Sequence, residues 1–391
     1  MLKSQNIPVM QDSSFHAQQI SGRQQDTSYI LSIIVKRTYD IEENGNCILS
    51  DYQVPIISEI ISYEDYPKLI SNDTDLYPFK YFTDIIIKGK AFAMRKSSRF
   101  LAEVEIDRNK ISYLIVGNRK AYLNSTGELK FTEPELIQEV PLRYDFAYGG
   151  KDTIAEQKIQ MPDHELTKYL PADLDLLQNS LYRYRRNPLG KGFLVEPNKK
   201  SIDILELPNL EDPENLLKPE NIVVKDPAQW YKLPLPRCTD WVDPLWFPRI
   251  AYFGLWNIEN NVALPEVYKK WADADILSIK PNIGQFNLRG TNGASLGLQL
   301  PYIRYNETIK LTNMHPKFSN FVIHLPTEYP TIWVDGRKGK LLPTKPVIHT
   351  IIIEPGVNRV SIVWRGSAPA LRPYHEEELK TMPYKVEWNN R

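Results

Sequence analysis

Residues 100–107, with the sequence FLAEVEID, decide the fold class that we expect for this chain. From Ala102 onward, apolar side chains occupy every second position and acidic side chains occupy the positions between them. Because successive side chains of a β-strand point to opposite faces, this alternation predicts a half-buried strand with its apolar face toward a core. The acidic face is expected to lie in solvent.

Segments of similar character recur along the chain. Runs rich in Ile, Val, Phe and Trp predict strands over residues 32–41, 85–87, 112–116, 320–325, 331–334, 347–354 and 359–364. The last two flank Pro355-Gly356, which predicts a hairpin in which Gly356 supplies a positive φ. Short helices are expected over 173–180, 264–275 and 375–381. With 30 prolines in 391 residues, the expected fold class is mainly β, with antiparallel, sandwich-like sheets, long Pro-rich loops and a few short helices.

The composition of the chain changes near residue 220. All eight tryptophans lie beyond residue 229, and residues 150–240 contain few clear strands. A chain of 391 residues is long enough for two domains, at about 150 residues per domain. We therefore expect a mobile N-terminal arm over residues 1–27, an N-terminal β domain with long connecting loops over 28–220, and a C-terminal Trp-rich β domain over 221–391.

Net charge and cysteine usage narrow the class of protein. Lys plus Arg and Asp plus Glu each number 48, so the formal net charge is +0, which argues against a general nucleic-acid-binding protein. Two cysteines, Cys47 and Cys238, are too few for a disulfide framework and are typical of a reducing compartment. The polar N-terminus has no signal-peptide core, and no apolar run approaches the ~18 residues of a membrane span. We expect a cytoplasmic protein that binds neither nucleic acid nor membrane.

The sequence contains no complete motif for catalysis or metal binding. Its six histidines form neither an HxH nor an HExxH pair, and no GxSxG nucleophile motif occurs. Cys238 has a basic neighbour, Arg237, that would lower the pKa of a thiol, but no histidine is near it in the sequence. The sequence therefore contains no local active-site motif, and we expect no cofactor and no metal site.

Three compact loop motifs are the most distinctive feature of the sequence: RYDFAYGG at 143–150, NPLGKGF at 187–193 and LPNLE at 207–211. Glycine permits a close approach of two backbones, proline fixes φ, and Asn and Arg side chains bond free main-chain groups. The motifs are either a purely structural connection or a preorganised docking surface. The residues concerned are Arg143, Tyr144, Gly149, Gly150, Asn187, Pro188, Gly190, Gly192, Phe193, Pro208, Asn209 and Glu211.

These motifs, in this order, resemble a bacterial family known as domain of unknown function 2169, whose members are associated with type VI secretion gene clusters. Residues 31–40 resemble its opening strand, which ends in a K-x-T-[FY]-D pattern, and residues 73–89 resemble its S-D-x-x-P-x-K-x-x-T-D run. Residues 116–119 are similar to a short V-x-G-x-R segment, and residues 246–249 match a further segment more loosely. The resemblance covers roughly residues 28–310.

The resemblance implies a non-enzymatic adaptor, or chaperone, that binds a secreted effector (a toxin) and helps to load it onto the VgrG/PAAR spike. We expect a monomer in a 1:1 complex with its effector, held by strand addition to a sheet edge or by docking in an apolar groove. Tryptophan is enriched among the residues that dominate interface energies. The expected contact residues are therefore Trp230, Trp241, Trp246, Phe247 and Trp256, although the same side chains alternatively fill a second core.

Two other functions remain open from the sequence. An enzyme would assemble its site from Asp, Glu and His on distant loops and would show a deep pocket with two carboxylates of shifted pKa. A carbohydrate-binding β-sandwich module would show a flat row of exposed aromatic side chains, for which the 22 tyrosines supply material.

Overall fold

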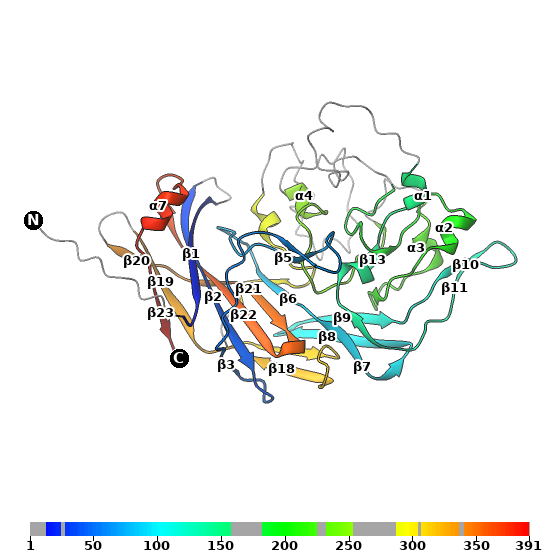
Figure 1. The fold of residues 1–391 in the computed structure, drawn as a ribbon, viewed down its shortest axis with the longest axis horizontal. Coiled ribbons are helices and arrows are strands. Elements are labelled where there is room, and N and C mark those ends of the chain that lie inside the picture. The colour runs from blue at the N-terminus through cyan, green and yellow to red at the C-terminus, as the bar shows by residue number, and fades with distance from the viewer. Residues whose placement is uncertain are drawn as a thin grey trace, which may run out of the picture.

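A computed structural model describes residues 13–24, 28–157, 182–224, 232–252, 287–303, 306–335 and 340–390 of the chain. The fold is mainly β and consists of several sheets in which almost all neighbouring strands are antiparallel, as the sequence predicted (Figure 1). None of the helices in these ranges is long and apolar enough to cross a membrane.

The largest sheet has seven strands in the order β1-β2-β22-β21-β6-β16, with β3 paired to β2. All of its pairs are antiparallel except β21 with β6, which is parallel. Its strands are β1 (His16–Arg23), β2 (Tyr29–Ile41), β3 (Cys47–Leu49), β6 (Thr83–Ile87), β16 (Gln299–Leu300), β21 (Val347–Glu354) and β22 (Arg359–Ala370). Strands from both ends of the chain therefore share one sheet.

The pairing of β2 with β22 is the longest ladder of the structure. It runs without a register shift from Tyr29 opposite Ala370 to Asp40 opposite Arg359. Both strands are buried over most of their length. In Figure 1 these two strands and β21 lie side by side in the middle of the large sheet.

A second sheet, in the order β15-β9-β8-β17-β18, shares the main hydrophobic core with the first. Strand β8 (Arg99–Ile106) contains the alternating sequence from which the fold class was predicted, and Ala102, Val104 and Ile106 are buried in that core as expected. The other strands are β9 (Asn109–Val116), β15 (Leu210–Glu211), β17 (Thr308–Thr312) and β18 (Asn320–His324). The two sheets with one apolar core between them give the sandwich-like arrangement.

A third sheet, in the order β20-β19-β23, lies against the large sheet where β19 crosses β22. Its strands are β19 (Tyr329–Asp335), β20 (Leu341–Pro343) and β23 (Lys385–Asn389). The crossing is close because Gly366 of β22 has no side chain: a Cβ atom there would lie 2.8 Å from the Cβ of Ile332.

The remaining elements are short. Two-stranded sheets are formed by β4 (Ile61–Ser62) with β5 (Ile70–Asn72), β7 (Lys90–Ser97) with β12 (Ile137–Pro141), β10 (Ala121–Leu123) with β11 (Leu129–Phe131), and β13 (Tyr148–Gly149) with β14 (Lys191–Gly192). Within the described residues, the α-helices are α1 (Thr153–Glu156), α2 (Lys199–Asp203), α3 (Pro219–Ile222), α4 (Arg249–Tyr252) and α7 (Glu376–Thr381). The 3-10 turns of the same ranges are η1 (Tyr144–Phe146), η5 (Leu288–Thr291) and η6 (Pro355–Val357).

Several expectations need correction. Residues 16–23, expected in a mobile arm, form β1 and pair along their whole length with β2. The expected division at residue 220 does not separate two sheets, since β2 pairs with β22 and one core cluster joins residues from Leu31 to Met382. The hairpin at 355–358 exists, but Asn358, with φ of 51°, supplies the left-handed residue in place of Gly356. The helix near the C-terminus is confirmed as α7, whereas 173–180 and 264–275 lie outside the described residues.

The close crossing at Gly366 yields a stability prediction. In Gly366→Ala, the new Cβ would lie 2.8 Å from the Cβ of Ile332 and would also clash with Thr344 Oγ1, so β19 and β22 must move apart. We expect the free energy of unfolding, measured by urea denaturation, to fall by about 1–3 kcal/mol. Gly356→Ala is the matched control, because a Cβ there would have no atom within 4 Å, and its stability should change little. Equal stabilities of the two variants would contradict the crossing.

Candidate functional site

Three buried ion pairs join segments that carry the resemblance, namely 31–40, 73–89 and 246–249. The Lys36 ammonium group lies 2.8 Å from Asp75 Oδ2, and the Lys80 ammonium group lies 2.8 Å from Asp84 Oδ2. A third pair joins Arg249 to Asp73 at 2.7 Å. All six side chains are almost completely buried. A buried charge is costly without its partner, so these residues fix the chain between β5 and β6 against the large sheet.

The loop motifs at 143–150 and 187–193 are joined by one side chain. The Asn187 amide nitrogen donates to the carbonyl oxygens of Tyr144 and Tyr148 at 2.8 and 3.1 Å, and Gly150 N donates to Asn187 O at 2.7 Å. The short parallel pair β13 with β14 continues this contact. Gly149 has φ of 147°, and a Cβ there would lie 2.2 Å from Asn187 O, so only glycine fits.

The third motif, at 207–211, closes the same junction. Asn209 N donates to Phe146 O at 2.8 Å, and the Asn209 amide nitrogen donates to Val116 O at 2.9 Å. Glu211 forms a buried ion pair with Arg119 and accepts from Leu217 N. The structure therefore brings all three motifs together. The motif residues that are buried are Tyr144, Gly149, Gly150, Asn187, Pro188, Gly192, Phe193, Pro208, Asn209 and Glu211.

The burial of these residues favours the structural interpretation of the motifs over a docking surface. Arg143 is only partly buried. Its guanidinium group bridges Asp65 and Asp145 at 2.8 Å each and lies over the Tyr63 ring. Gly190 is partly exposed, but a Cβ there would lie 2.4 Å from the Asn187 amide nitrogen. Gly190 thus serves the junction, whereas Arg143 ties the first motif to the segment around Asp65.

The expected aromatic contact residues are core residues. Trp241 is 1% exposed, Trp246 is 2% exposed and Phe247 is buried. Trp246 packs edge-on against Tyr144, with 5.3 Å between ring centroids. A partner cannot touch side chains buried to this degree, so the prediction that these three residues contact an effector is wrong for this conformation. Trp230 and Trp256 lie outside the described residues.

A buried polar cluster surrounds Cys238. Burial raises the pKa of the Cys238 thiol, which donates to Leu142 O at 2.9 Å. The Arg237 guanidinium group, the basic neighbour of this thiol in the sequence, pairs with Asp212. The neighbouring carboxyl of Asp240 accepts from the Tyr63 hydroxyl, and burial raises its pKa to about 6. The burial of Cys238 therefore favours the protonated form of its thiol. Among the described residues, no group of three His, Cys, Asp or Glu side chains has a geometry that would hold a metal.

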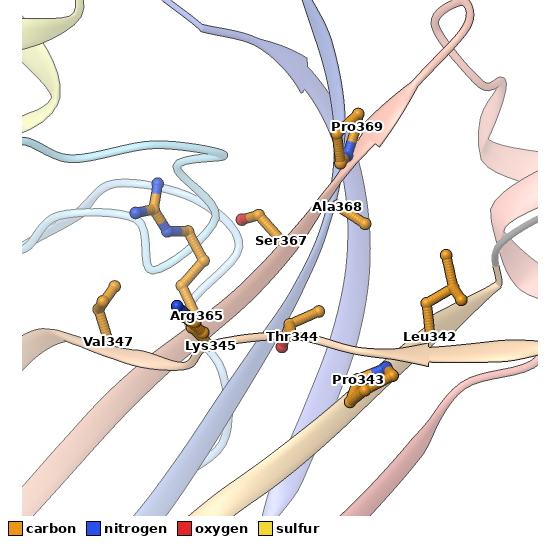
Figure 2. Close-up of a pocket in the computed structure, with 9 residues that line it drawn as sticks. All are labelled: Leu342, Pro343, Thr344, Lys345, Val347, Arg365, Ser367, Ala368 and Pro369. Carbon is orange, nitrogen blue, oxygen red and sulfur yellow. The ribbon is translucent and has the colours of Figure 1, made fainter.

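A surface groove lies where β22 extends beyond β21 (Figure 2). It has a volume of about 390 Å³. Figure 2 shows Lys345 and Arg365 at one end and Leu342 and Pro369 at the other. Its lining residues are Leu342, Pro343, Thr344, Lys345, Val347, Arg365, Ser367, Ala368 and Pro369. The lining thus combines a cationic end with an apolar end and contains no carboxylate.

Sequence reasoning missed this groove because it placed the end of the last long strand at residue 364, whereas β22 continues to Ala370. The added residues, RGSAPA, include Gly and Pro, which are depleted in strands. One signal was available in the sequence. The segment 29–41, which pairs along all of β22, is longer than the segment 347–354, which is too short to cover all of β22 on its other side.

The fold and this groove define a mainly β protein with an open sheet edge at its surface. The model of a family described as "uncharacterized protein conserved in bacteria" (DUF2169) matches residues 26–365. The chain therefore belongs to this bacterial family. The match extends beyond the expected limit near residue 310 and ends at Arg365, inside the groove. No curated protein and no solved structure gives a significant match.

The loop junction predicts a specific loss of stability in Asn187→Ala. Two buried carbonyl groups would each lose a hydrogen bond, so we expect the free energy of unfolding to fall by about 2–3 kcal/mol. Asn215→Ala is the control, since Asn215 is exposed. Urea denaturation of both variants checks this prediction. An Asn187→Ala protein as stable as the control would show that the junction does not depend on this amide.

Asp240 predicts a pH dependence of stability. Its pKa of about 6 in the folded chain exceeds the value of about 4 in the unfolded chain, so the folded chain holds an extra proton between these pH values. The stability contributed by this group is therefore present at pH 4 and lost as the pH rises through 6. Between these pH values, we expect the free energy of unfolding of the wild type to fall by about 2–3 kcal/mol. The Asp240→Asn protein should not show this fall. The exposed Glu133→Gln should behave like the wild type; identical pH profiles for all three would contradict the assignment.

Proposed function

We propose that this protein is a non-enzymatic adaptor that binds an effector protein of a type VI secretion system and helps to load it onto the VgrG/PAAR spike. In this proposal it acts in the cytoplasm of the donor cell as a monomer in a 1:1 complex with its effector. We take type VI secretion as the biological setting because the loop motifs resemble those of a family associated with type VI secretion gene clusters.

The structural observation that carries the proposal is the groove at the end of β22. Proteins that hold an extended segment of a partner commonly do so at an exposed sheet edge, where main-chain hydrogen bonds supply affinity and side-chain pockets supply specificity. Here the edge has apolar walls from Leu342 and Pro369, and Leu342 is 48% exposed. Leu371, directly after β22, is 93% exposed and extends the apolar surface.

The described residues give less support to the two alternative functions, a carbohydrate-binding module and an enzyme. The exposed large aromatic side chains among these residues are Tyr52, Tyr122 and Tyr302. They lie on three separate segments and not in the row that a sugar-binding face requires. A second hollow, of about 180 Å³, is lined by two carboxylates, Asp152 and Glu206. Asp152 accepts from three main-chain amides, and Lys191 lowers the pKa of Glu206. Neither group is arranged as a general acid.

The test is purification of the C-terminally tagged protein from its own bacterium, with the co-purifying proteins identified by mass spectrometry. We expect one large partner in near-equal amount that carries a toxin domain or a spike-tip domain. Recovery of the protein alone at several salt concentrations would contradict the adaptor function.

A matched pair of variants locates the contact. Leu342→Asp places a charge on the apolar wall of the groove and should abolish recovery of the partner, because an apolar contact would be replaced by an unpaired charge. Leu123→Asp is the control, since Leu123 is exposed to a similar degree on β10, away from the groove. Equal recovery with both variants would place the contact elsewhere.

A further inference from the structure

The open edge of β22 begins where β21 stops covering it. On one side, β2 pairs with β22 as far as Ala370. On the other side, the last pair is Val347 opposite Arg365. At about 3.3 Å per residue, the part of β22 from Gly366 to Ala370 is about 13 Å long, and among the described strands it has a partner on one side only.

The register shows which main-chain groups face the groove. Ile41 N donates to Asn358 O at 2.7 Å, one step beyond the pair of Asp40 with Arg359. Hydrogen-bonded and non-hydrogen-bonded pairs alternate in an antiparallel ladder, so the even-numbered residues of β22 bond to β2. Ser367 and Pro369 therefore direct their main-chain groups to the opposite edge. These are one N–H, from Ser367, and the two carbonyl oxygens.

The side chains agree with this alternation. The hydroxyl oxygens of Ser32 and Ser367 lie 2.7 Å apart, and those of Thr38 and Ser361 lie 3.1 Å apart. Side chains approach most closely across non-hydrogen-bonded pairs. Both contacts thus place the odd-numbered residues of β22 in such pairs with β2, with their main-chain groups turned to the other edge.

The chain before β21 leaves this edge instead of continuing along it. Thr344 N and Thr344 Oγ1 both donate to Ile332 O, at 2.8 and 2.9 Å, which attaches this segment to β19. The missing side chain of Gly366 makes room for Thr344. The space that a continued β21 would fill is the groove.

The charge of the groove is positive and uncompensated within the described part of the chain. Lys345 is exposed and has no ion-pair partner there. Arg365 is buried and donates to Pro78 O and to the Tyr302 hydroxyl, both neutral groups. Since the lining holds two cations and no acid, it complements a segment that carries carboxylates.

We propose that the groove binds an extended peptide segment with both acidic and apolar side chains, which adds as a strand to β22 at Ser367 and Pro369. Its acidic groups lie toward Lys345 and its apolar groups toward Leu342 and Pro369. Pro369 has no N–H to offer, which limits the added strand to a short segment. The proposal rests on the adaptor function in naming a segment of the effector as the natural occupant.

The test uses capped synthetic peptides and does not require the effector. The probes are VEVEVEV, VKVKVKV and a VEVEVEV peptide N-methylated at alternate residues, with binding measured by isothermal titration calorimetry. We expect VEVEVEV to bind about tenfold more tightly than VKVKVKV, and N-methylation to weaken binding about tenfold by removing strand hydrogen bonds. Equal binding of the two charge types, or of the N-methylated peptide, would overturn the proposal.

Charge-reversal variants give the internal control. Lys345→Glu should weaken VEVEVEV binding about threefold to tenfold and improve VKVKVKV binding. Lys317→Glu reverses an exposed lysine away from the groove and should leave both affinities unchanged. An unchanged preference in Lys345→Glu would overturn the proposed site.

The peptide result and the co-purification result can fail separately. Peptide binding with the expected preferences but no co-purifying effector would support the strand site and contradict the adaptor function. An effector whose recovery is unaffected by Lys345→Glu, together with no peptide binding, would support the adaptor function and overturn this site.

Discussion

The ladder between β2 and β22 organises the large sheet. It joins residues 29–40 to residues 359–370 in a single register, so the two ends of the chain must meet before the large sheet can form. Every other strand of that sheet is added to one side or the other of this pair. Because β22 pairs with β2 along its whole length but is longer than β21, the ladder also creates the open edge at Ser367 and Pro369.

The residues that identify the family are mostly structural. Lys36 and Asp75 come from two separate motifs and form one buried ion pair, while Asn187 joins two loops whose partners lie about 40 positions apart in the sequence. Such groups are costly to change, because each would leave a buried charge or carbonyl without its partner. The groove at the end of the family match is built differently, since its lining includes the exposed side chains of Leu342, Lys345 and Pro369.

The sequence predicted the fold class and most of the long strands because a half-buried strand carries its own signal, as in residues 102–107. It did not predict the last part of β22, since Gly366 and Pro369 oppose strand formation locally and the pairing with β2 overrides them. The loop motifs were found, but their mutual contacts depend on the folded chain. Trp241 and Trp246 were assigned to an interface because composition does not distinguish an aromatic core residue from an aromatic anchor.

We propose that the protein holds its partner at the open edge of β22. The decisive measurement is hydrogen–deuterium exchange of the protein, alone and bound to the effector recovered with it. We expect slower exchange on binding at Ser367, the one groove-facing amide of the open edge, and in residues 342–347, with little change at the loop junction around Asn187. Protection confined to other surfaces, with residues 366–370 exchanging equally fast in both states, would contradict it.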